Sequence, residues 1–267
     1  MRIPIFELNA FTDAPFSGNP AGVCPLERWL DDRDLQAIAA QNNLAETAFF
    51  VPREPGDAAP AYDIRWFAPT CEIDLCGHAT LASAWLLFHR GGRIGERVEF
   101  HSRRSGPLSV RRDGERLELD FPAMPGTPCE PPPRLLEGLG ATPREVLKAR
   151  DYMAVFEHED EVRALAPRMD AIASLDCLGV IATARGRDTD YVMRFFAPRA
   201  GIPEDPATGS IQCTLVPYWA ARLGRVRLRG RQLSERGGEF TCELRGARVG
   251  IAGHVVPYLE GTIEIGS

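Results

Sequence analysis

Two short segments of the chain each place polar residues on both sides of a glycine. Cys76-Gly-His78 lies in the first half and Thr208-Gly-Ser210 in the second. A glycine turn at the start of a helix leaves backbone N–H groups without partners, beside the positive end of the helix dipole. Each segment could therefore hold a carboxylate or stabilise an enolate-like oxygen. For one segment alone, a glycine that merely makes a turn is the simpler interpretation.

These segments belong to an internal repeat. Arg65-Trp-Phe-Ala-Pro69 precedes the first glycine, and Arg194-Phe-Phe-Ala-Pro198 precedes the second. The arginines are 129 positions apart (194 − 65), whereas Gly77 and Gly209 are 132 apart (209 − 77). We assign the three extra residues to the stretch Glu204-Asp-Pro206. The repeat predicts two similar half-molecules whose glycine turns can face one cleft, because a period this long does not fit a solenoid.

Two carboxylates and one imidazole are candidates for moving a proton. Glu46 stands among apolar neighbours, where partial burial would raise its pKa toward neutrality, although a lone glutamate at a strand edge is usually solvated. Asp205 precedes the second glycine turn and could be an acid, a base, an orienting group or a helix cap. His78 could donate to a substrate or bond a neighbouring carbonyl. The residue types leave these alternatives open.

The thiol of Cys76 is a further acid/base candidate. A cysteine just before a glycine turn could titrate, yet free cysteines are commonly small buried hydrophobes. The position equivalent to Cys76 in the repeat is Thr208, so any thiol chemistry here is one-sided.

Composition points to small-molecule chemistry. The 267 residues carry a net charge of −6, which disfavours nucleic acid and anionic membranes as partners. No long apolar segment is present, so we expect a soluble cytoplasmic protein. Seven scattered cysteines predict reduced thiols. Because the sequence lacks nucleotide-binding, GxSxG and zinc-ligand motifs, we expect no cofactor and no metal.

The elements that must position these residues follow from periodicity and turn signals. In the first half we predict a helix along Leu35, Ile38 and Ala39, capped by Asp32 or Asp34, and a second helix over 78–90. A turn-rich loop is predicted over 16–22 and another over 69–77. The predicted strands cover 3–11, 48–51, 62–68, 98–101, 108–112 and 117–121, with turns at Ser105-Gly106 and Asp113-Gly114.

The second half begins beyond a proline-rich linker over 121–133. We predict short helices over 143–147 and 159–166, and a motif helix over 210–223 that is kinked or broken at Pro217. The predicted strands cover 152–156, 179–183, 191–196, 226–229, 239–243, 247–251 and 261–265. The fold class is α+β: each half is a mixed sheet wrapped around a central helix. We place one half at 1–122, which a strand at about 257–267 could complete, and the other at 123–256.

Five segments together resemble the PhzF-like isomerases of phenazine biosynthesis. They are Phe11-Thr-Asp-Ala-Pro-Phe-Ser-Gly-Asn-Pro-Ala-Gly22, Asn43-Leu-Ala-Glu-Thr-Ala-Phe49, Arg65-Trp-Phe-Ala-Pro-Thr70, Leu75-Cys-Gly-His-Ala-Thr80 and Glu204-Asp-Pro-Ala-Thr-Gly-Ser210. The resemblance covers essentially the whole chain. It implies a diaminopimelate-epimerase-like fold with two pseudo-symmetric halves, a cofactor-free active site between them, and a homodimer.

The resemblance also implies roles for single residues. Glu46 falls on the proton-shuttling glutamate, with His78 and Asp205 on supporting acid/base and hydrogen-bonding positions. The remaining matches are to substrate-binding positions: Asn19, Gly77, Gly209 and Ser210. The best-known family reaction isomerises trans-2,3-dihydro-3-hydroxyanthranilate by moving a proton between ring carbons. Epimerases of this fold place a cysteine before each glycine turn, whereas this chain has Thr208 at the second position.

We therefore expect a cofactor-independent isomerase that moves a proton on a small carboxylate-bearing substrate. An epimerase or racemase that uses Cys76 with a carboxylate is one alternative. A catalytically silent small-molecule-binding protein of the same fold is another.

Overall fold

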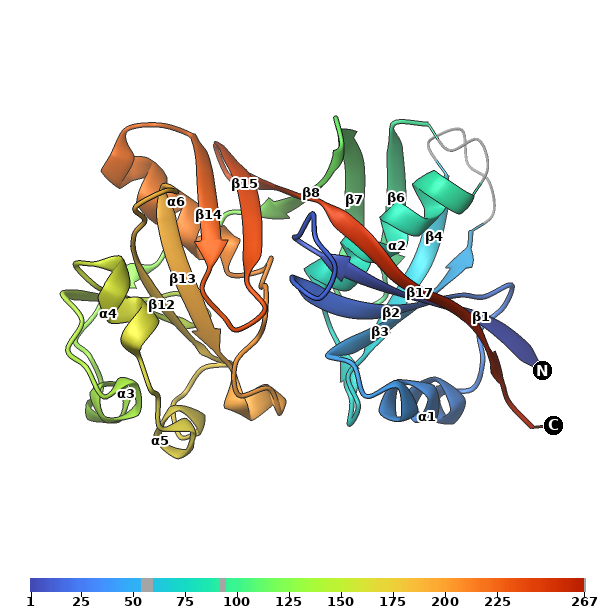
Figure 1. The fold of residues 1–267 in the computed structure, drawn as a ribbon, viewed down its shortest axis with the longest axis horizontal. Coiled ribbons are helices and arrows are strands. Elements are labelled where there is room, and N and C mark those ends of the chain that lie inside the picture. Colours follow the sequence, from blue (N-terminus) through green and yellow to red (C-terminus); the bar gives the residue numbers. More distant parts are fainter. Residues whose placement is uncertain (54–59, 92–94, 267) are drawn as a thin grey trace. The chain divides into compact units, whose positions relative to one another are not determined.

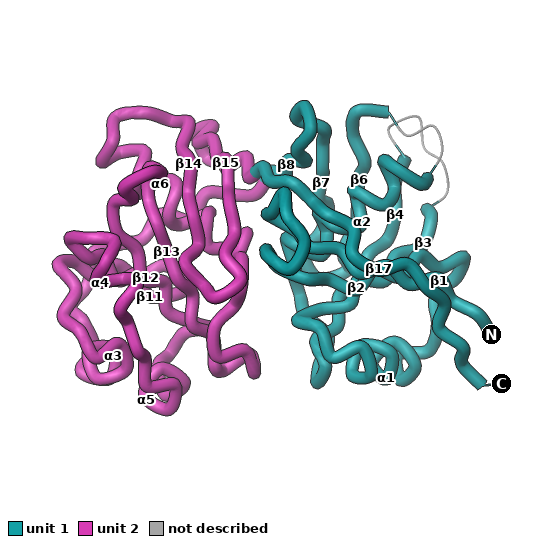
Figure 2. The backbone as a smooth tube through the Cα atoms, in the orientation of Figure 1, with its two compact units in different colours: residues 1–120, 252–267 teal, residues 121–251 magenta. Residues whose placement is uncertain are grey.

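The structure is a computed structural model that describes residues 1–53, 60–91 and 95–266 (Figure 1). The chain forms two compact units (Figure 2). Unit 1 comprises Met1–Asp120 and Ala252–Ser267, and unit 2 comprises Phe121–Ile251. Across the described ranges, none of the helices combines the length and apolar character needed to cross a bilayer.

Unit 1 is a mixed sheet with one helix buried against it. Its helices are α1 (Asp32–Asn42) and α2 (Gly77–Arg90), and its strands are β1 (Arg2–Ala10), β2 (Asn19–Pro25), β3 (Glu46–Pro52), β4 (Ala61–Phe67), β5 (Glu72–Ile73), β6 (Arg97–Ser102), β7 (Gly106–Asp113), β8 (Arg116–Pro122) and β17 (Val255–Glu264). Hydrogen-bonded neighbours run β17, β1, β2, β3, β4, β6, β7, β8, with β2–β3 and β4–β6 parallel and β5 added to β4. Ala79, Leu81, Ala82 and Ala84 of α2 are fully buried, as expected of a helix covered on most sides.

Unit 2 repeats this arrangement with shorter elements. Its helices are α3 (Pro133–Leu139), α4 (Glu159–Ala164), α5 (Met169–Ala173), the 3₁₀ turn η1 (Pro198–Ala200) and α6 (Gln212–Leu223). Its strands are β9 (Thr127–Pro128), β10 (Glu145–Lys148), β11 (Tyr152–Val155), β12 (Val180–Arg185), β13 (Tyr191–Phe196), β14 (Arg227–Gln232), β15 (Gly238–Arg245) and β16 (Arg248–Gly253). Hydrogen-bonded neighbours run from β9 through β10 to β15 in chain order. The α6 helix packs on β14 and β15. The predicted α+β class is confirmed.

Several predicted elements in unit 2 are wrong. The helix predicted over 143–147 is strand β10, which pairs with β9 on one side and β11 on the other. Val146 and Leu147 are both buried there, so pairing and burial outweigh the local helix signal. The true helix in this region, α3, begins at Pro133, a position proline favours. The 121–133 segment is therefore not only a linker, since Thr127–Pro128 joins the sheet.

Two predictions in unit 1 also need correction. The loop predicted over 16–22 ends early, because β2 begins at Asn19. Pro20 lies one residue before β2 starts to pair with β3 at Ala21, at a strand start where proline is tolerated. Neither Asp32 nor Asp34 caps α1: the N-cap residue is Asp31, which makes no side-chain capping bond.

The helix α6 runs through Pro217 without a break. Proline has no N–H, so the carbonyl four residues earlier loses its helical donor. That carbonyl belongs to Cys213, and it accepts a hydrogen bond from the Met124 N–H at 2.8 Å. The predicted break is wrong because the segment before β9 supplies the missing donor. The helix also begins at Gln212, two residues later than predicted.

Each half of the repeat closes its pre-helix turn with the same arginine–glutamate ion pair. Arg65 binds both carboxylate oxygens of Glu72, at 2.7 and 3.0 Å, and Arg194 binds both of Glu204, at 2.8 Å each. Each guanidinium also lies 4.9 Å from the ring of the phenylalanine two residues later. The glutamates are 132 positions apart (204 − 72), so the three extra residues precede Glu204. Our placement of them at Glu204-Asp-Pro206 is wrong; they lie in the segment that contains η1.

Replacing Arg65 with alanine should destabilise unit 1 strongly. The side chains of Arg65 and Glu72 are only 7% and 11% exposed, and the variant removes the bidentate partner of a carboxylate that keeps only its bonds from the exposed Arg103 and Arg104. We expect a loss of about 2 kcal/mol in unfolding free energy, the usual size for hydrogen bonds to charged groups. Urea denaturation followed by circular dichroism measures it. The matched control is Arg2→Ala, whose pair with Glu264 is about three-quarters exposed, 76% and 72%; it should change stability by less than about 1 kcal/mol. Equal losses in the two variants would contradict this account.

Candidate active site

The carboxyl group of Glu46 is held at the first residue of β3. Glu46 pairs with Ala21 of the parallel strand β2, and only 8% of the residue is exposed. Its Oε2 atom lies 3.2 Å from Nε2 of His78. The start of β3 thus places the predicted proton-shuttling glutamate against the imidazole of His78.

The start of α2 supplies the other two groups of this cluster. Cys76 is the N-cap residue, and its Sγ lies 3.4 Å from Nδ1 and 3.9 Å from Nε2 of His78. Thr80 fixes the turn, because both its hydroxyl and its N–H donate to the Cys76 carbonyl, at 2.6 and 3.2 Å. Donor atoms of Glu46, Cys76 and His78 all lie within 4.8 Å of one another. The helix begins at Gly77, so the predicted glycine turn at a helix start is present here.

His78 is held as a neutral imidazole. Burial lowers its pKa from about 6.5 to about 3, and a hydrogen bond to the Pro20 carbonyl offsets only part of this effect. The 3.2 Å contact with Glu46 would support an ion pair only if His78 were protonated, so we treat it as a contact of the neutral ring. Because a carbonyl can only accept, one ring nitrogen carries the proton toward Pro20. The other nitrogen offers a lone pair to an acid beside it.

Asn19 extends the cluster along β2. It is fully buried at the first residue of the strand, adjacent to Pro20. Its predicted substrate-binding role, like that of Gly77, stays a prediction.

In unit 2, Asp205 and Thr208 form a hydrogen-bonded loop. The Thr208 hydroxyl donates to the Asp205 carboxylate. Gln232 holds both residues: its Nε2 donates to the Asp205 carbonyl at 2.6 Å, and its Oε1 accepts from the Thr208 N–H at 2.8 Å. Gln212 adds a bond from its Nε2 to the Thr208 carbonyl at 3.1 Å. Asp205 is thus 8% exposed and firmly oriented.

The second glycine turn differs from the first. Gly209 precedes α6 by three residues, and the Gln212 N–H donates to the Gly209 carbonyl at 3.1 Å, as in a tight turn. Ser210 Oγ accepts a long bond from Arg150 at 3.4 Å. The cradle predicted here therefore lies in a turn ahead of the helix. The roles of Asp205, Gly209 and Ser210 stay predictions.

Three residues that shape the candidate site were not predicted: Pro20, Gln212 and Gln232. Pro20 lay in a predicted loop, yet its carbonyl orients His78. Gln212 and Gln232 are almost fully buried and satisfy backbone groups around Asp205. A buried glutamine leaves no pattern in a single sequence, and β14 was predicted to end at 229 instead of Gln232.

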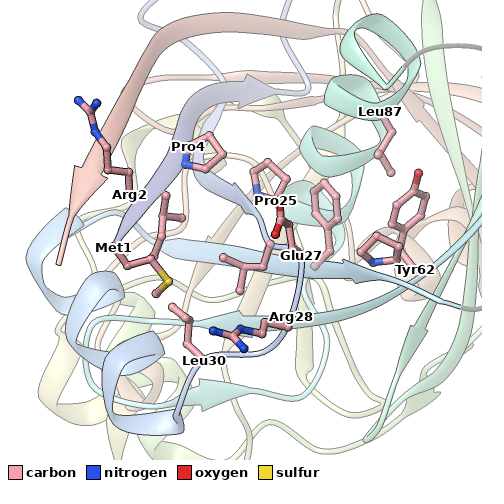
Figure 3. Close-up of a pocket in the computed structure, with 13 residues that line it drawn as sticks. Met1, Arg2, Pro4, Pro25, Glu27, Arg28, Leu30, Tyr62 and Leu87 are labelled. Atoms are coloured by element: carbon pink, nitrogen blue, oxygen red, sulfur yellow. The ribbon is translucent and has the colours of Figure 1, made fainter. Parts of the chain in front are cut away.

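A separate cavity of about 660 Å³ opens on unit 1 (Figure 3). Met1, Pro4, Pro25, Leu30 and Tyr62 are among the residues that line it. It adjoins Phe50 and Pro52, at the opposite end of β3 from Glu46. None of the predicted site residues lines this cavity.

The family model, the sequence relatives and the solved structures that match this chain all point to one family. The model of the phenazine biosynthesis-like protein family PhzC-PhzF matches residues 8–261. An uncharacterized isomerase of Pseudomonas aeruginosa is 50% identical over 265 residues, covering 99% of this chain and all of the relative. A crystal structure of a PhzF family protein from Enterococcus faecalis superposes with a TM-score of 0.94 at 41% identity, covering 99% of this chain and 100% of that one.

More distant solved structures share the fold. A hydroxyproline epimerase from Agrobacterium vitis superposes with a TM-score of 0.63 at 11% identity, covering 98% of this chain and 92% of that one. The predicted diaminopimelate-epimerase-like architecture is therefore confirmed as a fold.

Replacing His78 should change how stability depends on pH. Between about pH 6.5 and pH 3 the unfolded chain binds a proton at this residue and the folded chain does not. His78 therefore contributes a loss of stability as pH falls through this window, with a slope of about 1.4 kcal/mol per pH unit. Urea unfolding at pH 4.5 to 7.5, compared between wild type and His78→Gln, measures the difference. The exposed His89 of the same helix provides the matched control variant, His89→Gln. A wild-type to His78→Gln difference that is constant with pH would refute the neutral imidazole.

Replacing Gln232 with alanine should loosen the Asp205–Thr208 loop. The variant leaves the buried Thr208 N–H and Asp205 carbonyl without their glutamine partner. We expect a loss of about 1–3 kcal/mol in unfolding free energy. Hydrogen exchange of the Thr208 amide should also accelerate. Arg231→Ala is the control, because its pair with Glu239 is exposed. Unchanged protection at Thr208 would show that Gln232 does not hold the loop.

Proposed function

Because the chain belongs to the PhzC-PhzF family of phenazine biosynthesis-like proteins, we propose that it is an isomerase that moves a proton on a small carboxylate-bearing molecule. The observation that carries the proposal is the buried contact between Glu46 and a neutral His78. A carboxyl group beside a neutral imidazole can take up a proton and return it without placing a net charge on the ring.

Glu46 is the proposed proton carrier. Its carboxylate removes a proton from one substrate carbon and returns it to another on the same face, as a 1,3-shift requires. The Pro20 carbonyl accepts the N–H of the His78 ring, so the other ring nitrogen can accept a hydrogen bond from Glu46 once the carboxyl group is protonated. The ring therefore orients the Glu46 carboxyl group in the state that carries the transferred proton.

The start of α2 is the proposed site for the developing negative charge. Backbone N–H groups in the first turn have no helical acceptors, and the helix dipole adds positive potential there. Gly77 is the first residue of the helix and Cys76 its N-cap. An enolate-like oxygen bound at this turn would be stabilised in the transition state. We assign Asp205 to the supporting acid/base role that the family resemblance implies, and four residues to substrate binding: Asn19, Gly77, Gly209 and Ser210.

One observation favours a second candidate, an epimerase. The Cys76 thiol lies 3.4 Å from Nδ1 of His78, within hydrogen-bond distance for sulfur, so the thiol belongs to the same cluster as Glu46. Cys76 and Glu46 could then act as one thiol and one carboxyl in place of the two thiols of related epimerases. The residue equivalent to Cys76 in the repeat is Thr208, which argues against a symmetric two-thiol mechanism.

Glu46→Gln should abolish proton exchange between substrate and solvent. We expect the rate of deuterium incorporation to fall roughly 10²- to 10⁴-fold, the typical contribution of a general acid or base. The experiment incubates each protein in D₂O with a panel of small carboxylates that includes trans-2,3-dihydro-3-hydroxyanthranilate and follows carbon-bound deuterium by NMR. Glu260→Gln, whose side chain is 58% exposed, should exchange at the wild-type rate.

Two further variants separate the candidates. Loss of exchange in Cys76→Ala, with deuterium in an inverted product, would replace the isomerase with the epimerase. Cys71→Ser controls for general thiol effects, because Cys71 is exposed. Ligand binding that is equal in wild type and Glu46→Gln, with no exchange by either, would identify a silent binding protein instead.

A further inference from the structure

The cluster at the start of α2 contains three kinds of metal ligand. A thiol, an imidazole and a carboxyl group converge from Cys76, His78 and Glu46, with their donor atoms within 4.8 Å. They come from two rigid elements, the first residue of β3 and the first turn of α2. The sequence does not predict this cluster, because Glu46 and Cys76 are 30 positions apart (76 − 46).

The distances within the cluster suit a tetrahedral ion. Zinc binds sulfur at about 2.3 Å and nitrogen or oxygen at about 2.0–2.2 Å, so its ligand atoms lie roughly 3.3–3.7 Å apart. Here Nε2 of His78 is 3.2 Å from Oε2 of Glu46 and 3.9 Å from Sγ of Cys76, and the three donor atoms lie within 4.8 Å of one another. The two separations from Nε2 therefore lie about 0.1 Å below and about 0.2 Å above the tetrahedral range.

We propose that Glu46, Cys76 and His78 bind Zn²⁺ reversibly as an inhibitory site. The Cys76 thiol releases its proton to solvent and binds as thiolate, Glu46 binds as carboxylate, and His78 contributes a ring lone pair. Water fills the fourth position. A thiolate and an imidazole select zinc over magnesium and calcium, which prefer oxygen ligands.

The site is buried but reachable. Glu46, Cys76 and His78 are 8%, 5% and 6% exposed, so each residue keeps a small solvent-accessible surface. Bound zinc would occupy the carboxyl group that we propose as the proton carrier. This regulatory consequence rests on the proposed function, whereas metal binding itself does not.

Cobalt titration of the full-length chain, without a polyhistidine tag, tests the site directly. Co²⁺ bound by a thiolate gives a sulfur-to-metal charge-transfer band, and tetrahedral Co²⁺ gives intense visible bands. We expect both in wild type and in Cys71→Ser, with displacement by one equivalent of Zn²⁺. Cys76→Ala should lose the charge-transfer band, and Glu46→Gln should keep it while binding at least about tenfold more weakly. No charge-transfer band in wild type, or an unchanged band in Cys76→Ala, would overturn the proposal.

Activity provides a separate readout. Zinc should block the deuterium exchange described above, and a chelator should restore it. If the cobalt spectra appear as expected but neither wild type nor any variant exchanges deuterium, the proposed function is contradicted and the metal site stands. Deuterium exchange that continues at zinc concentrations that fully displace cobalt would show that the bound ion does not inhibit, which would overturn the inhibitory role.

Discussion

The burial of one neutral imidazole organises the candidate site. His78 lies in the first turn of a helix that the sheet of unit 1 covers on most sides, and its pKa of about 3 follows from that burial. A ring that cannot be charged must satisfy one donor and one acceptor, which the Pro20 carbonyl and the Glu46 and Cys76 side chains provide. The positions of β2, β3 and α2 are thereby tied together at one point.

The internal repeat separates scaffold from chemistry. Both halves keep a bidentate arginine–glutamate pair and the same arginine–phenylalanine stacking before the glycine turn. Beyond the glutamates the halves diverge: unit 1 has Cys76 and His78, whereas unit 2 has Thr208 and Ser210. A thiol and an imidazole are titratable side chains, whereas the two hydroxyls are not. Unit 1 therefore carries the titratable cluster, and unit 2 carries a hydrogen-bonded loop around Asp205.

Sequence predicted the repeat, the central helices and most strands because these depend on patterns that are local or simply repeated. Only the family resemblance placed Glu46 and His78 in one site, because their contact depends on how α2 packs against the start of β3. The strand β10 and the unbroken α6 could not be predicted in this way. Each depends on pairing with another segment. The strand β10 pairs with β9 and β11, and in α6 the Cys213 carbonyl accepts a hydrogen bond from Met124. Gln232 could not be predicted for the same reason, because its hydrogen-bond partners Asp205 and Thr208 lie 27 and 24 positions away in the sequence.

The same physical property that suits the cluster to proton transfer suits it to a metal ion. A group that exchanges protons readily must expose a lone pair in one protonation state, and a soft or borderline cation competes for that lone pair. Water-excluding walls strengthen both interactions, because charge is poorly screened in a buried site. A helix start that brings a thiol and an imidazole to a carboxyl group therefore has the chemistry that both proton transfer and zinc binding require. Thr208 and Ser210 at the equivalent positions of unit 2 do not form such a ligand set, since they offer neither a thiolate nor an imidazole nitrogen.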